Sequence, residues 1–258
     1  DKVNTTAIDI IGKEFPLWLG HPAEITETTN GQLHITAGQN SVLVDKLFAS
    51  IGRRPNIDKL NFAATGLQVA TNGIPIHNPH SMQIDNSHIF LAGDVTGERA
   101  ILHEAGFEGR VAGYNAMQAS AISFKKKTPL AITFCDPNIV AVGAQLSELD
   151  ENTIAIGEII LAPVGRALII GKNRGLIRIY ADKQSAKILG ASMISVKGEN
   201  LAHLLCWAIE MNLDVFDLLK MPFYHPVIEE ALQAALYDLK SKLGFEETHW
   251  PVELTPID

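Results

Sequence analysis

A histidine and a glutamate near the C-terminal end of the chain could together move a proton. His225 and Glu230 lie in the stretch that starts at Met221, where Pro222 and Pro226 restrict the backbone on both sides of the histidine. An imidazole whose second nitrogen is held by a carboxylate is an oriented proton donor and acceptor near neutral pH. A histidine that only caps a helix, with a glutamate that faces solvent, fits the same spacing. Spacing alone favours this plainer interpretation.

The element that would position this pair is a helix predicted after the second proline. Pro226 can occupy the first position of a helix, where its missing N–H is not needed. His225 is therefore expected at the helix entrance, with Glu230 about one turn further along the same helix. Apolar residues then follow at helical spacing, namely Ala231, Leu232, Ala235, Leu236 and Leu239.

A glycine and an aspartate earlier in the chain could form half of a ligand site. Residues 89–92 are continuously apolar, which predicts a central parallel strand, and Gly93 and Asp94 follow at its carboxyl end. Glycine lets a ligand approach the backbone, and a carboxylate accepts hydrogen bonds from hydroxyls, so a sugar or polyol chain suits this position. A helix predicted over residues 100–120 would offer free N–H groups and a partial positive charge beside Asp94. An ordinary strand-ending turn is the plainer alternative.

The N-terminal part of the chain is expected to be mostly β structure. Residues 1–50 show short strand candidates, with Asn30-Gly31 as a tight hairpin turn and a buried strand over residues 41–47. The helix over residues 100–120 is predicted to bury an apolar face made of Ile101, Leu102, Ala105, Val111 and Ala112.

The pattern changes after a linker-like segment, residues 121–129, where we place a domain boundary. Strand candidates follow, several as hairpin-like pairs, and then two helices over residues 199–210 and 215–219, which is typical of an α+β domain. The strand candidates are residues 132–134, 139–142, 154–161, 167–170, 176–181 and 188–192.

Composition excludes several classes of protein. Of the 258 residues, 47% are hydrophobic and 19% are charged, which indicates a globular chain, and the net charge of −8 disfavours nucleic acid or an anionic membrane as partner. We expect neither a membrane span nor a secretory signal. Cys135 and Cys206 show no paired spacing, which favours a reducing cytoplasm, and no motif predicts a metal site. The chain begins at Asp1 without Met, so we expect a fragment.

Four segments in order resemble a known family. They are Gly52-Arg53-Arg54-Pro55-Asn56, the run from Ile89 to Asp94, the helix segment from His103 to Gly109, and His225-Pro226-Val227-Ile228-Glu229-Glu230. Together they are similar to the C-terminal half of the pyridine nucleotide–disulfide oxidoreductases, and among these most similar to dihydrolipoamide dehydrogenases. Each segment is modest alone, but four in the family's order cover nearly all of the chain.

The resemblance implies an α/β flavoprotein-domain fragment followed by an α+β interface domain with an antiparallel sheet and flanking helices. Residues 1–50 would be the tail of the NAD-binding domain, residues 51–123 the returning segment of the FAD-binding domain, and residues 128–258 the dimerisation domain. The implied cofactors are FAD and NAD(P), and the implied partners are a second copy of the chain and a small-molecule or lipoyl-type dithiol substrate.

The resemblance also implies roles for single residues. Asp94, after Gly93, matches the aspartate that holds the flavin ribityl chain, and Leu102 matches the position whose backbone N–H approaches the flavin pyrimidine edge. His225 and Glu230 match the catalytic dyad, which reaches into the active site of the partner subunit. There the histidine is the acid/base for the dithiol, and the glutamate orients it.

This sequence also departs from the family pattern. Val227 and Ile84 each stand where the family usually has Thr, and the GxGxxG of the FAD site, the redox-active CxxxxC and the NAD fingerprint are absent. We therefore expect that the chain as given neither binds FAD tightly nor turns over. Two alternatives stay open: a stand-alone dimerisation or binding module with a vestigial dyad, and a flavin NAD(P)H reductase or transhydrogenase of the same fold without a redox disulfide.

Overall fold

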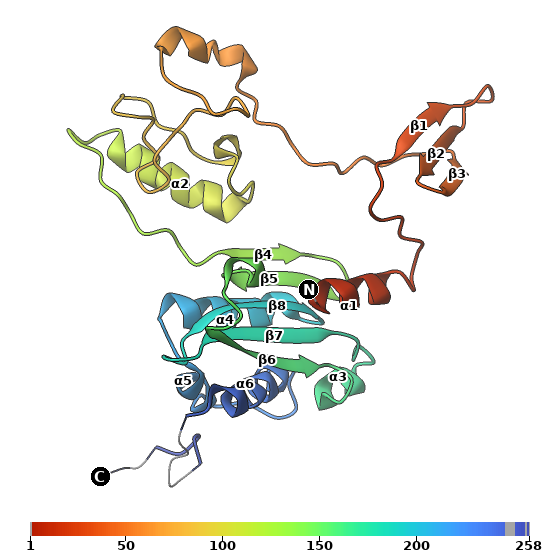
Figure 1. The fold of residues 1–258 in the computed structure, drawn as a ribbon, viewed down its shortest axis with the longest axis vertical. Helices are drawn as coiled ribbons and strands as arrows, with labels where there is room; N and C mark the ends of the chain where they lie inside the picture. The colour runs from red at the N-terminus through yellow and green to blue at the C-terminus, as the bar shows by residue number, and fades with distance from the viewer. Residues whose placement is uncertain (1, 246–250, 256, 258) are drawn as a thin grey trace. The chain divides into compact units, whose positions relative to one another are not determined.

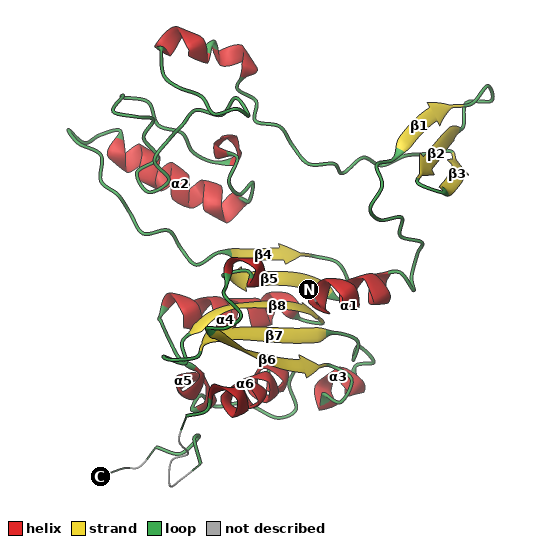
Figure 2. Cartoon of the chain, in the orientation of Figure 1, coloured by secondary structure: helices red, strands yellow, loops and turns green. Residues whose placement is uncertain are grey.

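The chain divides into two compact units. The computed structural model describes residues 2–245, 251–255 and 257. One unit combines Asp1–Pro22 with Lys127–Asp258, and the other is Ala23–Lys126. Each unit is described by itself below. Figure 2 shows that long helices and strands are concentrated in the first unit, whereas much of the second unit is loop.

The first unit is built on a five-stranded antiparallel sheet. Its strands have the spatial order β4-β5-β8-β7-β6, and every neighbouring pair is antiparallel (Figure 1). This confirms the predicted antiparallel sheet with flanking helices. The strands are β4 (Leu130–Thr133), β5 (Asn138–Gly143), β6 (Ile154–Ile160), β7 (Leu176–Asp182) and β8 (Ile188–Ser195).

Helices cover one face of this sheet and complete the main core. The helices are α3 (Gly165–Ile169), α4 (Gly198–Glu210), α5 (Val215–Leu219) and α6 (Glu230–Leu243). Alternate residues of β7, Ile177 and Ile179, pack in one cluster with Leu205 of α4 and Leu236 of α6, and none is more than 1% exposed. Burying each such side chain stabilises the fold by about 1.5–3 kcal/mol. The apolar stripe predicted for the last helix is buried as expected.

A helix at the start of the chain packs on the opposite face of the sheet. Helix α1 (Lys2–Ile11) buries Val3, Ala7 and Ile10, which cluster with Leu176 and Ile194 of the sheet. The expectation of β structure in residues 1–50 is therefore wrong for Lys2–Ile11. The three buried residues repeat at spacings of four and three, which is a helical stripe.

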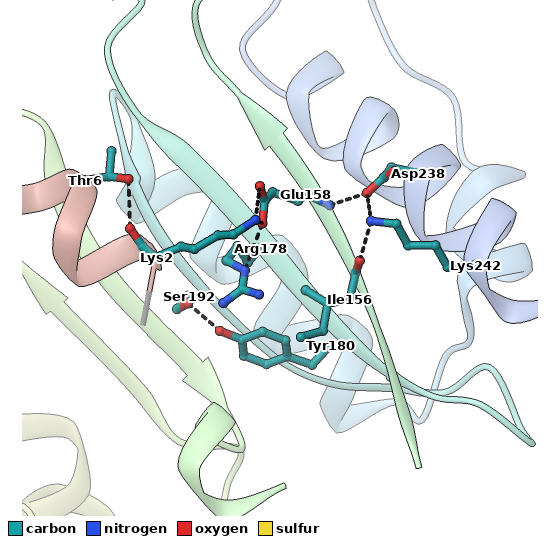
Figure 3. A network of polar contacts seen from close by, with 9 residues as sticks. All are labelled: Lys2, Thr6, Ile156, Glu158, Arg178, Tyr180, Ser192, Asp238 and Lys242. Carbon is teal, nitrogen blue, oxygen red and sulfur yellow. Dashed lines mark hydrogen bonds and ion pairs between the residues drawn. The ribbon is translucent and has the colours of Figure 1, made fainter. Parts of the chain in front are cut away.

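Polar contacts tie α1 to the sheet beside this apolar cluster. The Lys2 ammonium lies 3.0 Å from one carboxylate oxygen of Glu158 on β6, and Arg178 Nε on β7 lies 3.1 Å from the other (Figure 3). One carboxylate thus joins a helix and two neighbouring strands. Arg178 is only 8% exposed, so water solvates its charge poorly, and the Glu158 carboxylate compensates that charge.

Hydrogen bonds join helix α6 to β6, one of the two edge strands of the sheet. The backbone N–H of Glu158 donates to Asp238 Oδ2 at 2.7 Å, and the Lys242 ammonium donates to the Ile156 carbonyl at 2.9 Å and to Asp238 at 2.6 Å (Figure 3). Edge strands expose backbone groups that would otherwise pair with another chain, and these side chains occupy them. The same contacts fix the helix that begins with Glu230.

Adding a methyl group to Gly157 is expected to destabilise the first unit. A Cβ at Gly157 would lie 2.2 Å from the Ala235 carbonyl oxygen and 2.5 Å from Leu239 Cβ, because α6 packs directly on this glycine. Such overpacking costs about 1–3 kcal/mol, so Gly157→Ala should lower the urea midpoint of unfolding. The control is Gly165→Ala in α3, where a Cβ would meet nothing within 4 Å. Equal midpoints for the two variants would contradict the close packing.

Two local predictions in the first unit are wrong. Residues 167–170 belong largely to helix α3 instead of a strand, because a short apolar run does not distinguish the two. Helix α6 begins at Glu230 and not at Pro226. His225 therefore lies in the loop before the helix, and Glu230 is the first residue of the helix.

The second unit begins with a small antiparallel sheet. The predicted hairpin is confirmed: β1 (Glu24–Glu27) pairs with β2 (Leu33–Ala37), and Gly31 in the turn has a φ of 82°. Strand β3 (Asn40–Val44) follows, but four of its five residues are exposed, so the expectation of a buried strand is wrong. Apolar residues in a strand are buried only when a second layer covers them, so strand propensity alone does not predict their burial.

The rest of the second unit contains helix α2 (Leu102–Asn115) and irregular chain. The parallel strand predicted over residues 89–92 is wrong, because the segment makes only an isolated antiparallel bridge between Gln83 and Phe90. The predicted apolar face of α2 is also wrong in part: Leu102 is 88% exposed, whereas Glu104 and Glu108 are buried. Short 3-10 turns complete the described elements: Asp58–Leu60, Phe62–Thr65 and Asp94–Thr96 here, and Leu146–Glu148 in the first unit. Among the described residues, no helix is long and apolar enough to cross a bilayer.

Candidate functional site

His225 and Glu230 are in direct contact. His225 Nδ1 lies 2.8 Å from Glu230 Oε1, and the backbone N–H of Val227 donates to Glu230 Oε2 at 3.0 Å. The loop from α5 to α6 therefore folds back on the first residue of α6, and both carboxylate oxygens are bonded within it. The His225 side chain is 79% exposed, whereas that of Glu230 is 29% exposed. The ring is thus oriented at its inner nitrogen and open to a partner at its outer one.

The electrostatics of the pair define which nitrogen can accept a proton. The hydrogen bond from His225, and then that from the Val227 N–H, holds the pKa of Glu230 below its usual 4.5. Glu230 is therefore ionised at neutral pH and can only accept hydrogen bonds, so the proton of a neutral imidazole resides on Nδ1. Nε2 then carries the free lone pair, which is what a general base needs.

An apolar groove lies beside the pair. It has a volume of about 520 Å³, and its lining includes residues of α4 and of the loop that carries His225. Several lining side chains are exposed although they are large and apolar, and exposed apolar patches of this kind mark binding surfaces. The exposed lining residues are Leu204, Trp207, Met211, Met221 and Tyr224.

Gly93 and Asp94 form a tight turn in the second unit. Gly93 adopts φ 84° and ψ −158°, a conformation that side chains larger than hydrogen rarely allow. The Asp94 carboxylate lies 2.6 Å from an Arg53 guanidinium nitrogen, and the same nitrogen donates to the Ala100 carbonyl at 3.3 Å. Arg53 therefore joins the Gly52-Arg53-Arg54-Pro55-Asn56 segment to the turn.

Helix α2 starts a few residues after this turn. Leu102 is its first residue, so its backbone N–H has no acceptor within the helix, and its side chain is 88% exposed. His103 faces solvent. The buried carboxylate of Glu108, further along α2, accepts a hydrogen bond from the Gly93 N–H. Sequence spacing revealed neither Arg53 nor Glu108 as a partner of the turn, since both contacts join distant segments. Among the described residues, no group of three or more His, Cys, Asp or Glu side chains could hold a metal ion.

Two family descriptions match the chain. Residues 18–109 match the pyridine nucleotide-disulphide oxidoreductase model, and residues 130–236 match the dimerisation domain of the same family. Together the two matches cover most of the chain. The chain belongs to the pyridine nucleotide-disulphide oxidoreductase family. The exposed groove and the His225 loop both lie within the residues matched by the dimerisation domain.

Individual relatives agree with the family assignment. Dihydrolipoyl dehydrogenase from Haloferax volcanii is 29% identical over 213 residues, which are 81% of this chain and 43% of that protein. Mercuric reductase from Lysinibacillus sphaericus is 27% identical over 208 residues, 80% of this chain and 37% of that protein. The chain spans about half the length, or less, of the curated relatives it matches.

Solved structures share the fold of the chain. LpdA from Mycobacterium tuberculosis superposes with a TM-score of 0.78 at 21% identity, covering 93% of this chain and 53% of that one. The HOCl-induced flavoprotein disulfide reductase RclA from Escherichia coli gives a TM-score of 0.76 at 20% identity, covering 93% of this chain and 55% of that one. The sequence matches thus show the family, and the solved structures show the fold.

Proposed function

We propose that this chain is the C-terminal half of an FAD-dependent, NAD(P)-linked dithiol/disulfide oxidoreductase that resembles dihydrolipoamide dehydrogenase. His225 is the acid/base, and Glu230 orients it. The observation that carries the proposal is the 2.8 Å contact between His225 Nδ1 and Glu230 Oε1, which leaves Nε2 open. A capping histidine would not need a bonded, ionised carboxylate behind its ring.

The chemistry of the pair follows from its geometry. A substrate thiol gives its proton to His225 Nε2 and becomes a thiolate, which can attack a disulfide. The imidazolium that forms is stabilised by Glu230, and it returns the proton to the thiolate that leaves. When bound, flavin would supply the onward transfer of electrons to a pyridine nucleotide. The disulfide itself would come from the part of the enzyme that precedes this chain.

The second unit has features that suit a flavin. Asp94 can accept hydrogen bonds from the hydroxyls of a polyol chain, and the first N–H groups of α2, including that of Leu102, can meet an electron-rich ring edge. Gly93 lets the ligand approach the backbone. In this proposal residues 1–50 are the tail of the NAD-binding domain, and residues 51–123 are the closing segment of the FAD-binding domain.

The groove beside His225 is proposed as the homodimer interface, within residues 128–258. Large apolar side chains such as Trp207 and Tyr224 are 62% and 80% exposed there, and interface cores are enriched in such residues. A second copy of the chain would cover them. His225 would then reach a site on the partner subunit, so the dithiol substrate meets groups from both copies.

The test compares the chain alone with the chain joined to the N-terminal half of a related enzyme. Alone, the chain is expected to purify without stoichiometric flavin and to show no turnover, because the pyrophosphate-binding glycine motif and the redox-active cysteines are absent from it. Joined to the missing half, it should bind flavin and oxidise a lipoyl-type dithiol with NAD(P). Flavin that co-purifies in equal amount with the chain alone would refute the proposal that flavin binding requires the N-terminal half.

A further inference from the structure

Glu108 is a carboxylate buried where carboxylates are rarely found. It is 2% exposed, and it shares the buried side of α2 with Glu104, Val111 and Asn115. Charged side chains are almost never buried this far unless they are paired or hydrogen-bonded, since desolvation of a charge is unfavourable. A specific hydrogen-bond partner must therefore offset the cost of burying Glu108.

That partner is the backbone of the Gly93 turn. Glu108 Oε2 accepts a hydrogen bond from the Gly93 N–H at 2.7 Å, which is short for such a bond and typical of a charged acceptor. Gly93 is in the conformation that favours glycine, and a Cβ there would lie 3.4 Å from Ala105 Cβ of α2. The helix thus holds the turn by a hydrogen bond and by close packing. Asp94 is the next residue.

We propose that Glu108 is a positioning residue for the flavin site: its bond to the Gly93 N–H fixes the turn that presents the Asp94 carboxylate to the polyol hydroxyls. The inference rests on the proposed function, because the ligand of Asp94 comes from it. Arg53 holds the Asp94 side chain from the protein surface, and Glu108 holds the preceding backbone from the interior. The two contacts together restrict where the Asp94 carboxylate can lie.

The electrostatics of Glu108 determine which substitutions are informative. Burial raises the pKa of Glu108 above 4.5, and the Gly93 N–H bond opposes that effect only in part. The protein therefore keeps an acceptor oxygen at this position although its charge is unfavourable there. Glutamine retains an acceptor oxygen at nearly the same place without the charge, whereas alanine removes it.

The test measures the turn and the flavin separately. In this chain, hydrogen exchange of the peptide that contains Gly93 should become faster in Glu108→Ala and stay close to wild type in Glu108→Gln. The matched control is Glu104→Ala, which also removes a buried carboxylate from α2 but not one bonded to Gly93. In the full natural protein, Glu108→Ala should weaken FAD binding by about 10- to 100-fold, as expected when a buried N–H loses its acceptor, and Glu108→Gln should restore most of it.

Asp94→Ala, which removes the acceptor oxygens, separates failure of this inference from failure of the proposed function. If Asp94→Ala weakens FAD binding and Glu108→Ala does not, Glu108 does not position the site, and the flavin role of Asp94 stands. If Asp94→Ala leaves FAD binding unchanged, the proposed flavin role of Asp94 is wrong, and the inference falls with it. Equal losses in Glu104→Ala and Glu108→Ala would show that α2 only needs its buried carboxylates for stability, which also overturns the inference.

Discussion

Replacing His225 with glutamine is expected to lower dithiol turnover by about 10²- to 10⁴-fold in the assembled enzyme, the usual contribution of a positioned acid/base. Glutamine is close in size and polar but cannot take a proton at the position of Nε2. Steady-state oxidation of dihydrolipoamide measures the loss, with kcat expected to fall more than KM changes. FAD content should not change, because His225 and Asp94 lie in different compact units.

The matched control is His21→Gln, since His21 is an exposed histidine of the same unit that lies outside the pair. Its turnover should equal that of wild type. If His225→Gln stays within about threefold of wild type, the imidazole is not the acid/base, because removing one costs far more than this. A large loss in both variants would indicate a general effect of histidine replacement instead.

Replacing Glu230 with glutamine should have a smaller effect in the same assay and shows what the carboxylate adds. The amide oxygen can still accept one hydrogen bond, but the negative charge that stabilises the imidazolium is lost.

The pH dependence of Glu230 follows from its lowered pKa in the folded protein. The ionised carboxylate stabilises the fold above pH 4.5, and this contribution is lost only as the pH falls through the lower folded-state pKa. Protonation of Glu230 therefore cannot cause a loss of activity between pH 5 and 7, and any acid limb there must arise elsewhere.

The antiparallel sheet was predictable because its signals are local. Each strand of the first unit is a short apolar run bounded by turn residues, and its neighbour along the chain often pairs with it, as β6 pairs with β7. The stripe on α6 was equally clear, because Ala231, Leu232 and Leu239 keep helical spacing. Local periodicity was misleading in β3, where it predicted a buried strand although Val42 and Leu43 are exposed.

Helix α2 shows why the buried side of a helix cannot always be derived from hydrophobicity. If the apolar residues of a helix were always the buried ones, Leu102 would be buried and Glu108 exposed. In the structure Leu102 is exposed and Glu108 is buried. Glu108 is buried because its carboxylate accepts a hydrogen bond from the Gly93 N–H. The two residues are 15 positions apart, so helical spacing does not predict their contact. A pairing of His225 with Glu230 could be proposed from the sequence because the two residues are five positions apart, but spacing alone favoured a capping histidine, and the contact itself is a finding of the structure. The Arg53–Asp94 contact could not be proposed in this way, since it depends on tertiary structure.

Replacing Trp207 with glutamate is expected to dissociate the proposed homodimer. Trp207 lies in the groove and is 62% exposed, so the mutation places a carboxylate where the second copy would bury an indole. In a two-fold interface each substitution occurs twice. If each copy loses about 2 kcal/mol, as for a typical hot-spot residue, dimer affinity falls by about 10³-fold. Sedimentation at micromolar concentration should then give the mass of one chain, against two for wild type.

The control for this prediction is Leu168→Glu in α3, because Leu168 is similarly exposed, at 52%, but does not line the groove. It should remain a dimer, which shows that a new surface charge alone does not dissociate the assembly. Since His225 is proposed to act on the partner subunit, Trp207→Glu should also abolish turnover of the assembled enzyme, although it leaves His225 and Glu230 intact. A monomeric Trp207→Glu variant with full turnover would mean that the pair acts within its own subunit, and a wild-type monomer would remove the proposed interface altogether.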